Sequence, residues 1–197
     1  MSSEWIETSN GNRISKKATI KGSHRILISG MCVIDPECTV DGHVRVLEQS
    51  SSTISMGRFC LIGKGAVLRP PVIGYKTDKT TGKKVPVHAP LVMNSYTIVK
   101  AGGQIHCKQI GSRVVIGCNA KLGRCSNIGD VVIVDDGVVV PENCQIPSFT
   151  RVRKNQEWND SITLEPLNGS FKSIIESWCK EQYLGISVKV DDWFEDP

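Results

Sequence analysis

Four histidines are the side chains of this 197-residue sequence best suited to metal or acid–base chemistry: His24, His43, His88 and His106. A catalytic zinc site needs three protein ligands that converge on one metal and leave a fourth position open. A general base needs a histidine that lies beside the acceptor and is held there by a further polar group. His88 and His106 are candidates for such a base, but neither has a carboxylate close to it in the sequence. The histidines therefore favour a protein without a reaction centre and leave an enzyme as the alternative.

Eight cysteines are the other reactive side chains, and none of them forms a Cys-x-x-Cys pair. The common spacings of zinc ribbons and thioredoxins are therefore absent. We expect no secretory signal in the opening MSSEWIETSNGNRISKK, because it contains no hydrophobic segment followed by a cleavage site. The cysteines are then expected to be reduced thiols that fill small apolar positions.

The composition indicates a single globular domain, with enough apolar residues for a core. Hydrophobic residues make up 40% of the sequence, charged residues make up 22%, and the formal net charge is +4. Such a mild charge does not indicate a nucleic-acid-binding face. No apolar run approaches the length of a membrane-spanning helix. We therefore expect no nucleic-acid binding, no direct membrane insertion and a cytoplasmic location.

A six-residue repeat dominates the sequence from residue 110 to residue 152. Every sixth position is aliphatic: Ile110, Ile116, Leu122, Ile128, Val134, Val140, Ile146 and Val152. The residue four places later is small or β-branched, and the residue directly after the aliphatic one is a turn former. A period of six does not fit an α-helix, but it fits a short strand, a corner and another short strand. The aliphatic and the small side chains should both point inward, and three such sides should close one triangular coil.

The same repeat is present in the first half of the chain. Its aliphatic positions there are Ile28, Ile34, Val40, Val46, Met56, Ile62, Leu68, Val99 and Ile105. Cys32, Cys38 and Cys60 occupy small positions. A register shift from Glu48 to Thr53 predicts a small protruding loop. The sequence therefore predicts an all-β fold, a parallel β-helix whose coils stack at about 4.8 Å.

Residues 69–90 interrupt the repeat with four prolines, two glycines and four lysines. This composition predicts an exposed loop that projects from one corner of the solenoid. The lysines are candidate partner-binding residues: Lys76, Lys79, Lys83 and Lys84. They would either be solvated or contact an acidic partner, where complementary charge raises the association rate and the specificity.

A C-terminal α-helix is predicted after the last coil, with Ser170 as a candidate N-cap and Gly185 as a candidate stop signal. One side of this helix carries further candidate partner-binding residues: Phe171, Ile174, Ile175 and Trp178. That side would pack either on the prism or on a partner. We therefore divide the chain into a solenoid over residues 1–157 and a C-terminal helix with an acidic tail, DDWFEDP, over residues 158–197.

Two motifs stand out from the general repeat. One is the opening Ile-Glu-Thr-x-x-Gly-Asn in WIETSNGNRISKKATIKGS, and the other is Gly-Arg-x-Cys followed by Arg-Pro-Pro in ISMGRFCLIGKGAVLRPP. Together with QIGSRVVIGCNAKLGRCSNI, they resemble the family of dynactin subunit five, a subunit of the pointed-end complex. The similarity covers most of the chain from Trp5 to Arg153.

This resemblance implies a left-handed coil, a handedness that the periodicity alone cannot supply. It implies a non-enzymatic scaffold or adaptor subunit without cofactor, within a hetero-oligomer. The implied partners are subunit six, the actin-related protein and the large zinc-containing subunit of dynactin, together with dynein cargo adaptors. The implied role is support of dynein-dependent binding and transport of cargo, such as early endosomes, along microtubules of the cytoskeleton.

Hexapeptide-repeat β-helices also include acyltransferases and gamma-class carbonic anhydrases, which are the enzyme alternatives. The carbonic anhydrase pattern has two histidines five residues apart, a spacing that the four histidines here do not show. Where that family has Arg-Gly-Asp, this chain has Asp41-Gly42-His43. An acyltransferase would use a loop histidine as its base, for which His88 or His106 could serve. We expect no catalytic, metal or cofactor residues.

Overall fold

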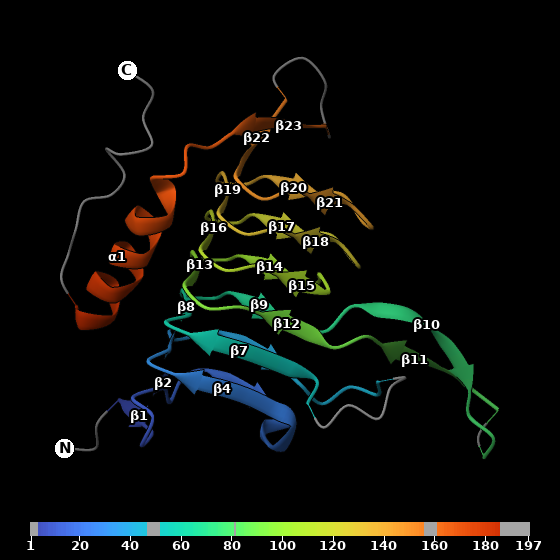
Figure 1. Cartoon of the computed structure of the whole chain (residues 1–197). Coiled ribbons are helices and arrows are strands. Elements are labelled where there is room, and N and C mark those ends of the chain that lie inside the picture. The colour runs from blue at the N-terminus through green and yellow to red at the C-terminus, as the bar shows by residue number, and fades with distance from the viewer. Residues whose placement is uncertain (1–3, 47–51, 81, 156–160, 186–197) are drawn as a thin grey trace.

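The computed structural model describes residues 4–46, 52–80, 82–155 and 161–185. Three sheets of mostly parallel strands form the sides of a solenoid (Figure 1). Sheet A has the order β1-β2-β5-β8-β13-β16-β19-β22-β23, sheet B the order β20-β17-β14-β9-β6-β3 and sheet C the order β21-β18-β15-β12-β7-β4. From β2 to β22, apart from the two-stranded sheet β10-β11, successive strands lie in sheets A, B and C in turn, so the chain winds around the three sides as a parallel β-helix.

The strands are short, as expected for a coil with three corners. Sheet A contains β1 Trp5–Glu7, β2 Arg13–Ser15, β5 Val33–Ile34, β8 Leu61–Ile62, β13 Thr97–Val99, β16 Val114–Ile116, β19 Val132–Val134, β22 Thr150–Lys154 and β23 Ile162–Pro166. Sheet B contains β3 Thr19–Lys21, β6 Thr39–Asp41, β9 Val67–Leu68, β14 Gln104–Ile105, β17 Lys121–Leu122 and β20 Val139–Val140. Sheet C contains β4 Ile26–Gly30, β7 Ile54–Arg58, β12 Leu91–Met93, β15 Gln109–Ile110, β18 Asn127–Ile128 and β21 Gln145–Ile146. The other elements are the 3-10 helix Ser23–Arg25, the strands β10 Val72–Thr77 and β11 Lys84–His88, and the helix α1 Phe171–Leu184.

The six-residue repeat places its aliphatic side chains inside the solenoid. In the coils formed by residues 109–152, each strand pairs with the strand eighteen residues later, as in Val114↔Val132 and Asn127↔Gln145. The eight aliphatic residues predicted to point inward are all buried: Ile110, Ile116, Leu122, Ile128, Val134, Val140, Ile146 and Val152. The predicted parallel β-helix is therefore confirmed.

The small positions are filled as the repeat predicts. Cys32, Cys38 and Cys60 lie in the core with exposures of 1% or less, and their thiols are free. The Cys38 thiol donates to the carbonyl oxygen of Gly63 at 3.0 Å. A glycine at the corner allows successive coils to approach closely, because a Cβ on Gly117 would lie 2.5 Å from the backbone nitrogen of Asp136.

Sheet A differs from the other two sheets at its ends. Its first strand, β1, is antiparallel to β2, and its last strand, β23, is antiparallel to β22. The outermost strands of sheet B are β3 and β20, and those of sheet C are β4 and β21, all paired in parallel. The reversed strands end the parallel ladder of sheet A, because neither offers an edge that continues it in the same direction.

The segment predicted as a loop over residues 69–90 contains a β-hairpin. Strands β10 and β11 pair antiparallel from Val72↔His88 to Thr77↔Lys84, with a register shift between Val72 and Gly74. The hairpin projects from the solenoid between β9 of sheet B and β12 of sheet C (Figure 1). The proline-rich composition concealed two strands, because edge strands tolerate proline. Of the loop expected from Glu48 to Thr53, residues 48–51 lie outside the described residues.

The helix α1 begins and ends close to the predicted positions. Ser170 precedes it, but the Ser170 side chain forms no capping hydrogen bond; instead the Asn168 side-chain oxygen accepts from the Ser170 N–H at 3.1 Å. Gly185 has the left-handed conformation of a C-terminal stop, with φ of 76°. The expected boundary at residues 157 and 158 and the tail DDWFEDP lie outside the described residues.

Candidate protein-binding surfaces

The outward face of sheet A carries an unbroken apolar row, which distinguishes it from the other two faces. Val33, Leu61, Ile98, Val115 and Ile133 follow one another in register along the outside of the sheet. Helix α1 lies along this face (Figure 1) and contributes Ile175, Trp178 and Cys179 to a shared cluster of buried side chains. This second core joins the helix to four successive coils.

Polar contacts fix the middle and the C-terminal end of α1 on the solenoid. Near its middle, the guanidinium of Arg113 forms an ion pair with Glu176. At its C-terminal end, Arg13 donates to the Tyr183 carbonyl oxygen at 2.5 Å, and the Tyr183 hydroxyl donates to the Gly11 carbonyl oxygen at 2.9 Å. A cation at a helix C-terminus also interacts favourably with the helix dipole.

Large side chains support α1 from the corner between sheets C and A. Phe59, Tyr96, Val131 and Phe149 occupy equivalent corner positions with φ between 56° and 60° and pack against the second core. The rings of Phe59 and Tyr96 stack at 5.4 Å, and Tyr183 of the helix contacts Phe59 edge-on at 5.8 Å. The left-handed conformation is unusual for valine and aromatic residues, so this corner exchanges some backbone strain for contacts with the helix.

The predicted binding residues of the helix are divided between the chain's own core and its edge. Ile175 is fully buried and Trp178 is 7% exposed, and both pack against sheet A. Phe171 packs on the margin of the same cluster, and Ile174 is half-buried. Of the two alternatives for this helix face, the structure therefore supports packing on the prism.

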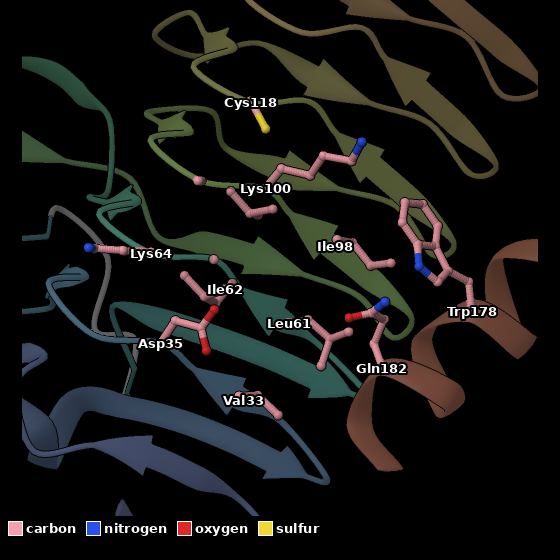
Figure 2. A pocket seen from close by; sticks show the side chains of 13 residues that line it. Val33, Asp35, Leu61, Ile62, Lys64, Ile98, Lys100, Cys118, Trp178 and Gln182 are labelled. Carbon is pink, nitrogen blue, oxygen red and sulfur yellow. The ribbon is translucent and has the colours of Figure 1, made fainter. Parts of the chain in front are cut away.

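A groove of about 470 Å³ runs between α1 and the adjacent corner of the solenoid (Figure 2). Leu61 and Ile98 of sheet A form its apolar floor, and Trp178 and Gln182 line it from the helix. Such a groove can accept an apolar side chain of another molecule.

Three charged side chains surround the apolar floor of this groove. Asp35, Lys64 and Lys100 all line it (Figure 2). Partial burial raises the pKa of the Asp35 carboxyl. The Lys100 ammonium lies 5.6 Å from the centre of the Trp178 ring, a cation–π distance.

The predicted lysine cluster lies on the hairpin. Lys76, Lys79, Lys83 and Lys84 are all exposed, and Lys84 pairs in register with Thr77. The hairpin turn is closed by backbone contacts between Asp78 and its neighbours, including the Asp78 N–H to the Lys83 carbonyl oxygen at 2.9 Å. The structure thus brings the four lysines together on the hairpin, which is distant from α1 in the sequence.

The two candidate histidine bases lie beside a cavity of about 390 Å³ at the base of the hairpin. His88 is 2% exposed, its Nδ1 lies 2.8 Å from the Pro70 carbonyl oxygen, and its N–H donates to the Arg45 carbonyl oxygen. Burial, and secondarily the nearby Arg69, lower the pKa of His106. These contacts give His88 a role in attaching the hairpin to the coil.

No group of three or more His, Cys, Asp or Glu side chains within the described residues is placed to hold a metal ion. Over the same residues, no helix has the length and apolar character needed to cross a membrane. His24 and His43 are exposed and lie in the coils nearest the N-terminus.

The sequence profile of a protein family described as dynactin subunit 5 matches residues 1–157. This range contains every coil of the solenoid. The chain belongs to the dynactin subunit 5 family. The dynactin subunit 5 of Dictyostelium discoideum is 28% identical over 110 residues, which are 56% of this chain and 48% of that protein. The match thus spans about half the length of that relative.

Solved structures of bacterial acyltransferases share the fold of this dynactin subunit 5 family member. An N-acyltransferase from Bacillus cereus, solved with dTDP and 3-hydroxybutyryl-CoA, is 14% identical, with coverage of 91% of this chain and 92% of that chain and a TM-score of 0.64. A UDP-N-acetylglucosamine O-acyltransferase from Moraxella catarrhalis is 14% identical, with coverage of 88% and 63% and a TM-score of 0.56. At this identity the likeness concerns the fold alone. The solenoid is a left-handed parallel β-helix of the hexapeptide-repeat type.

The apolar face that α1 covers was not predicted, although the sequence contains a signal for it. Val115 and Ile133 occupy the variable position just before an inward aliphatic residue, and they are eighteen residues apart. The equivalent positions on the other two faces are mixed, with polar residues such as Gln109 and Lys121 next to apolar ones such as Val92 and Val139. A period of eighteen in the variable position would have indicated which of the three sides binds the helix.

Proposed function

We propose that this chain is a non-enzymatic scaffold subunit of the dynactin pointed-end complex. In this role it binds the neighbouring pointed-end subunits, namely subunit six, the actin-related protein and the large zinc-containing subunit. It thereby supports the attachment of dynein cargo adaptors and of cargo such as early endosomes, in the cytoplasm and along microtubules. The observation that carries the proposal is the family match over residues 1–157.

The character of the surfaces supports a binding role. The groove beside α1 combines an apolar floor with Asp35, Lys64 and Lys100, and the hairpin presents four exposed lysines. Apolar contacts supply most of the affinity at protein interfaces, whereas charges at the rim set the rate and the specificity of association. In this proposal Ile175 holds the helix on sheet A and Trp178 lines the groove from the helix side. Phe171 and Ile174 are the helix residues that a partner would reach.

The contacts of the histidines also favour a scaffold over an acyltransferase. A general base must reach the acceptor and be held in the right orientation. His88 is buried with its Nδ1 against a backbone carbonyl, and the residues lining the cavity near His106 include Arg69 and Arg124. A histidine that accepts a proton becomes a positively charged imidazolium. The positive charges of the two arginines disfavour that form.

Affinity capture tests the assembly. The tagged full-length chain is expressed in cells of its source organism and captured at physiological salt. Mass spectrometry identifies the proteins that are captured with it. Recovery of actin-related filament subunits together with a pointed-end partner is the expected result. Capture of the chain alone, or as a homotrimer, would contradict the proposal.

A charge-reversal series tests the hairpin. Replacing Lys76, Lys79, Lys83 and Lys84 with Glu should reduce the recovery of at least one acidic partner about tenfold or more, because repulsion replaces attraction. The matched control replaces four exposed lysines elsewhere, Lys16, Lys17, Lys21 and Lys121, with Glu and should leave recovery unchanged. Equal losses in both variants would remove the hairpin from the interface.

Enzyme assays test the alternative directly. The purified chain is incubated with acetyl-coenzyme A and a panel of amine and hydroxyl acceptors, and separately with carbon dioxide. We expect no turnover above the uncatalysed rate. A measurable rate that His106→Ala abolishes, with the fold intact by circular dichroism, would establish a catalytic function instead.

A further inference from the structure

The groove between α1 and sheet A reaches the last turn of the helix. Trp178 and Gln182 line it from the helix side (Figure 2). Gln182 is exposed and lies three residues before Gly185, where the described part of the chain ends. Residues 186–197 lie outside the described part, but they follow Gly185 and therefore start close to the groove. They are a candidate occupant that every copy of the chain carries.

The sequence of residues 186–197 matches the apolar part of the groove. It reads ISVKVDDWFEDP and contains two adjacent aromatic residues, Trp193 and Phe194. Leu61 and Ile98 form the floor of the groove, whose volume is about 470 Å³. Aromatic side chains are frequent anchors of protein contacts, because they bury a large area with few rotatable bonds. The groove is therefore suited to hold one of these two rings.

The charges of the same segment match the lysines beside the floor. Four carboxylates flank the two aromatic residues: Asp191, Asp192, Glu195 and Asp196. The Lys100 ammonium lies 5.6 Å from the centre of the Trp178 ring, and Lys64 forms an exposed ion pair with Glu37 at 3.3 Å. An exposed pair of this kind is weak, so both ammonium groups can attract a further carboxylate.

The acidic side chain that lines the groove, Asp35, lies two coils away from Lys100. Asp35 follows β5 and Lys100 follows β13, and β8 lies between these strands in sheet A. Two strand spacings of ~4.8 Å separate the two residues by about 10 Å along the sheet. This is about the distance over which salt at 0.1 M screens exposed charges, so Asp35 repels a carboxylate beside Lys100 only weakly.

We propose that the DDWFED sequence, residues 191–196, binds in this groove of its own chain. An aromatic ring lies on Leu61 and Ile98, and the flanking carboxylates lie beside Lys64 and Lys100. A partner must displace this contact before it can use the groove, so the contact controls access to that surface. This consequence rests on the proposed function, whereas the contact itself does not.

The connecting residues are long enough for this contact. Trp193 follows Gly185 by eight residues, which span up to about 26 Å when extended. The groove extends from the coil of Val33 to the coil of Cys118, three strand spacings or about 14 Å. Trp193 can therefore reach any part of the groove.

Covalent attachment favours the chain's own segment over a free partner. A segment joined through a short linker has an effective concentration on the order of 1 mM. With an intrinsic Kd of about 0.1 mM, it would occupy the groove for about nine-tenths of the time. The apparent Kd of a competing partner would then be raised about tenfold.

The Cys118 thiol is a probe of the contact, because Cys118 lines the groove and is partly exposed (Figure 2). The purified full chain is treated with iodoacetamide, and mass spectrometry follows the labelling of each cysteine. In the double variant Trp193→Ala, Phe194→Ala, Cys118 should react at least about threefold faster, since the groove is no longer covered for most of the time. Cys125 and Cys144, partly exposed thiols outside the groove, should keep their rates.

The matched control is Val188→Ala, Val190→Ala, which removes two apolar side chains from the same segment but leaves DDWFED intact. Its Cys118 should react at the rate of the parent chain. Diluting the parent chain should not change that rate either, because the contact is intramolecular. Unchanged Cys118 labelling in the aromatic variant, or equal acceleration in the control, would overturn the inference. Protection that disappears on dilution would also overturn it, since the segment of a second copy would then fill the groove.

Photo-cross-linking locates the contact directly. A benzophenone amino acid at position 194 should form an intrachain cross-link to residues 61–64 or 98–101, which line the groove. Intrachain cross-links confined to other parts of the solenoid would overturn the inference.

The contact and the proposed function fail separately. Protected Cys118 in a chain that captures no dynactin subunits would keep the contact and overturn the dynactin assignment. Captured dynactin subunits together with Cys118 labelling that is the same in the parent chain and the aromatic variant would do the reverse.

Discussion

Val139 and Val140 are neighbours in strand β20, yet their surroundings are opposite. Val140 is fully buried inside the solenoid, and Val139 is 54% exposed on the outside of sheet B. Strand geometry requires this alternation, because successive side chains point to opposite faces. Comparing substitutions at these two positions therefore separates the effect of side-chain burial from that of the strand backbone.

Aspartate at these two positions should have very different costs. Val140→Asp buries an unpaired carboxylate and should lower the free energy of unfolding by about 3–5 kcal/mol. Val139→Asp changes an exposed side chain and should cost no more than about 0.5 kcal/mol. Urea unfolding followed by circular dichroism measures both. Similar losses would show that the interior column is assigned wrongly, and the same test applies to Ile128 and Val134.

The Cys179 thiol should give the chain a measurable loss of stability at alkaline pH. Burial, with a further contribution from Glu176, raises the pKa of Cys179 from 9.0 to about 12. The folded chain keeps this thiol neutral, whereas the unfolded chain ionises it near pH 9. The stabilisation is therefore complete below pH 9 and is lost between pH 9 and about 12, by about 1.4 kcal/mol per pH unit.

Urea titrations at pH 8, 9 and 10 check this prediction. Cys179→Ala should reduce the decline in unfolding free energy between pH 9 and pH 10 by about 1 kcal/mol, because the variant has no thiol to ionise. Cys118→Ala, at a partly exposed thiol, is the control and should keep the decline of the parent chain. Identical pH profiles for Cys179→Ala and the parent chain would contradict the role of burial.

At the residue scale, the sequence predicted the interior better than the surface. Inward positions such as Ile116 and Leu122 follow from periodicity alone, because a buried column tolerates only apolar side chains of limited size. The left-handed conformation of Val131 and Phe149 could not be predicted, because it contradicts their intrinsic backbone preference. The conformation belongs to the coil corner itself, because Cys125 and Asn143 adopt it outside the second core. Contacts with α1 explain only why large side chains occupy this particular corner.

Helix α1 illustrates the scale of single elements, since its bounds follow from its own residues, whereas its docking site follows only from the eighteen-residue period of apolar residues in sheet A. The apolar spacing and Gly185 locate the helix, but they do not identify the face of the solenoid that receives it. Four strands were not predicted from the sequence, for a different reason: β1, β10, β11 and β23. They lie outside the repeat and pair antiparallel, so periodicity carries no information about them.

The attachment of α1 can be tested with two aliphatic truncations in the same helix. Ile175→Ala removes a fully buried side chain and should cost about 2–5 kcal/mol, because it leaves a cavity between helix and sheet. Leu184→Ala removes a side chain that is 66% exposed and should cost less than about 0.5 kcal/mol. Chemical denaturation of the two variants measures the difference. Equal effects would indicate that the helix is not docked on sheet A in solution.

At the scale of the whole molecule, α1 joins coils that would otherwise contact only their neighbours. In a solenoid each coil interacts with the next, so unfolding can spread from one end. The second core includes Leu61, Ile98, Val115 and Ile133, which belong to four different coils of sheet A. Helix docking should therefore couple these coils into one cooperative unit.

Hydrogen exchange followed by mass spectrometry can detect this coupling. In the parent chain, strands β8, β13, β16 and β19 should exchange through a single opening with similar free energies. In the double variant Ile175→Ala, Trp178→Ala the strands nearest the C-terminal end should lose protection first, and the spread between strands should exceed about 1 kcal/mol. A graded pattern already present in the parent chain would show that the helix does not couple the coils.

The reversed strands at the two ends of sheet A set the height of the molecule. A solenoid of repeated coils has no intrinsic length, because each new coil offers the same template to another. Here β1 and β23 terminate that series on one side at both ends, so the number of coils is fixed by the chain itself. The solenoid can therefore act as a rigid spacer, which keeps partners bound at its two ends at a constant separation.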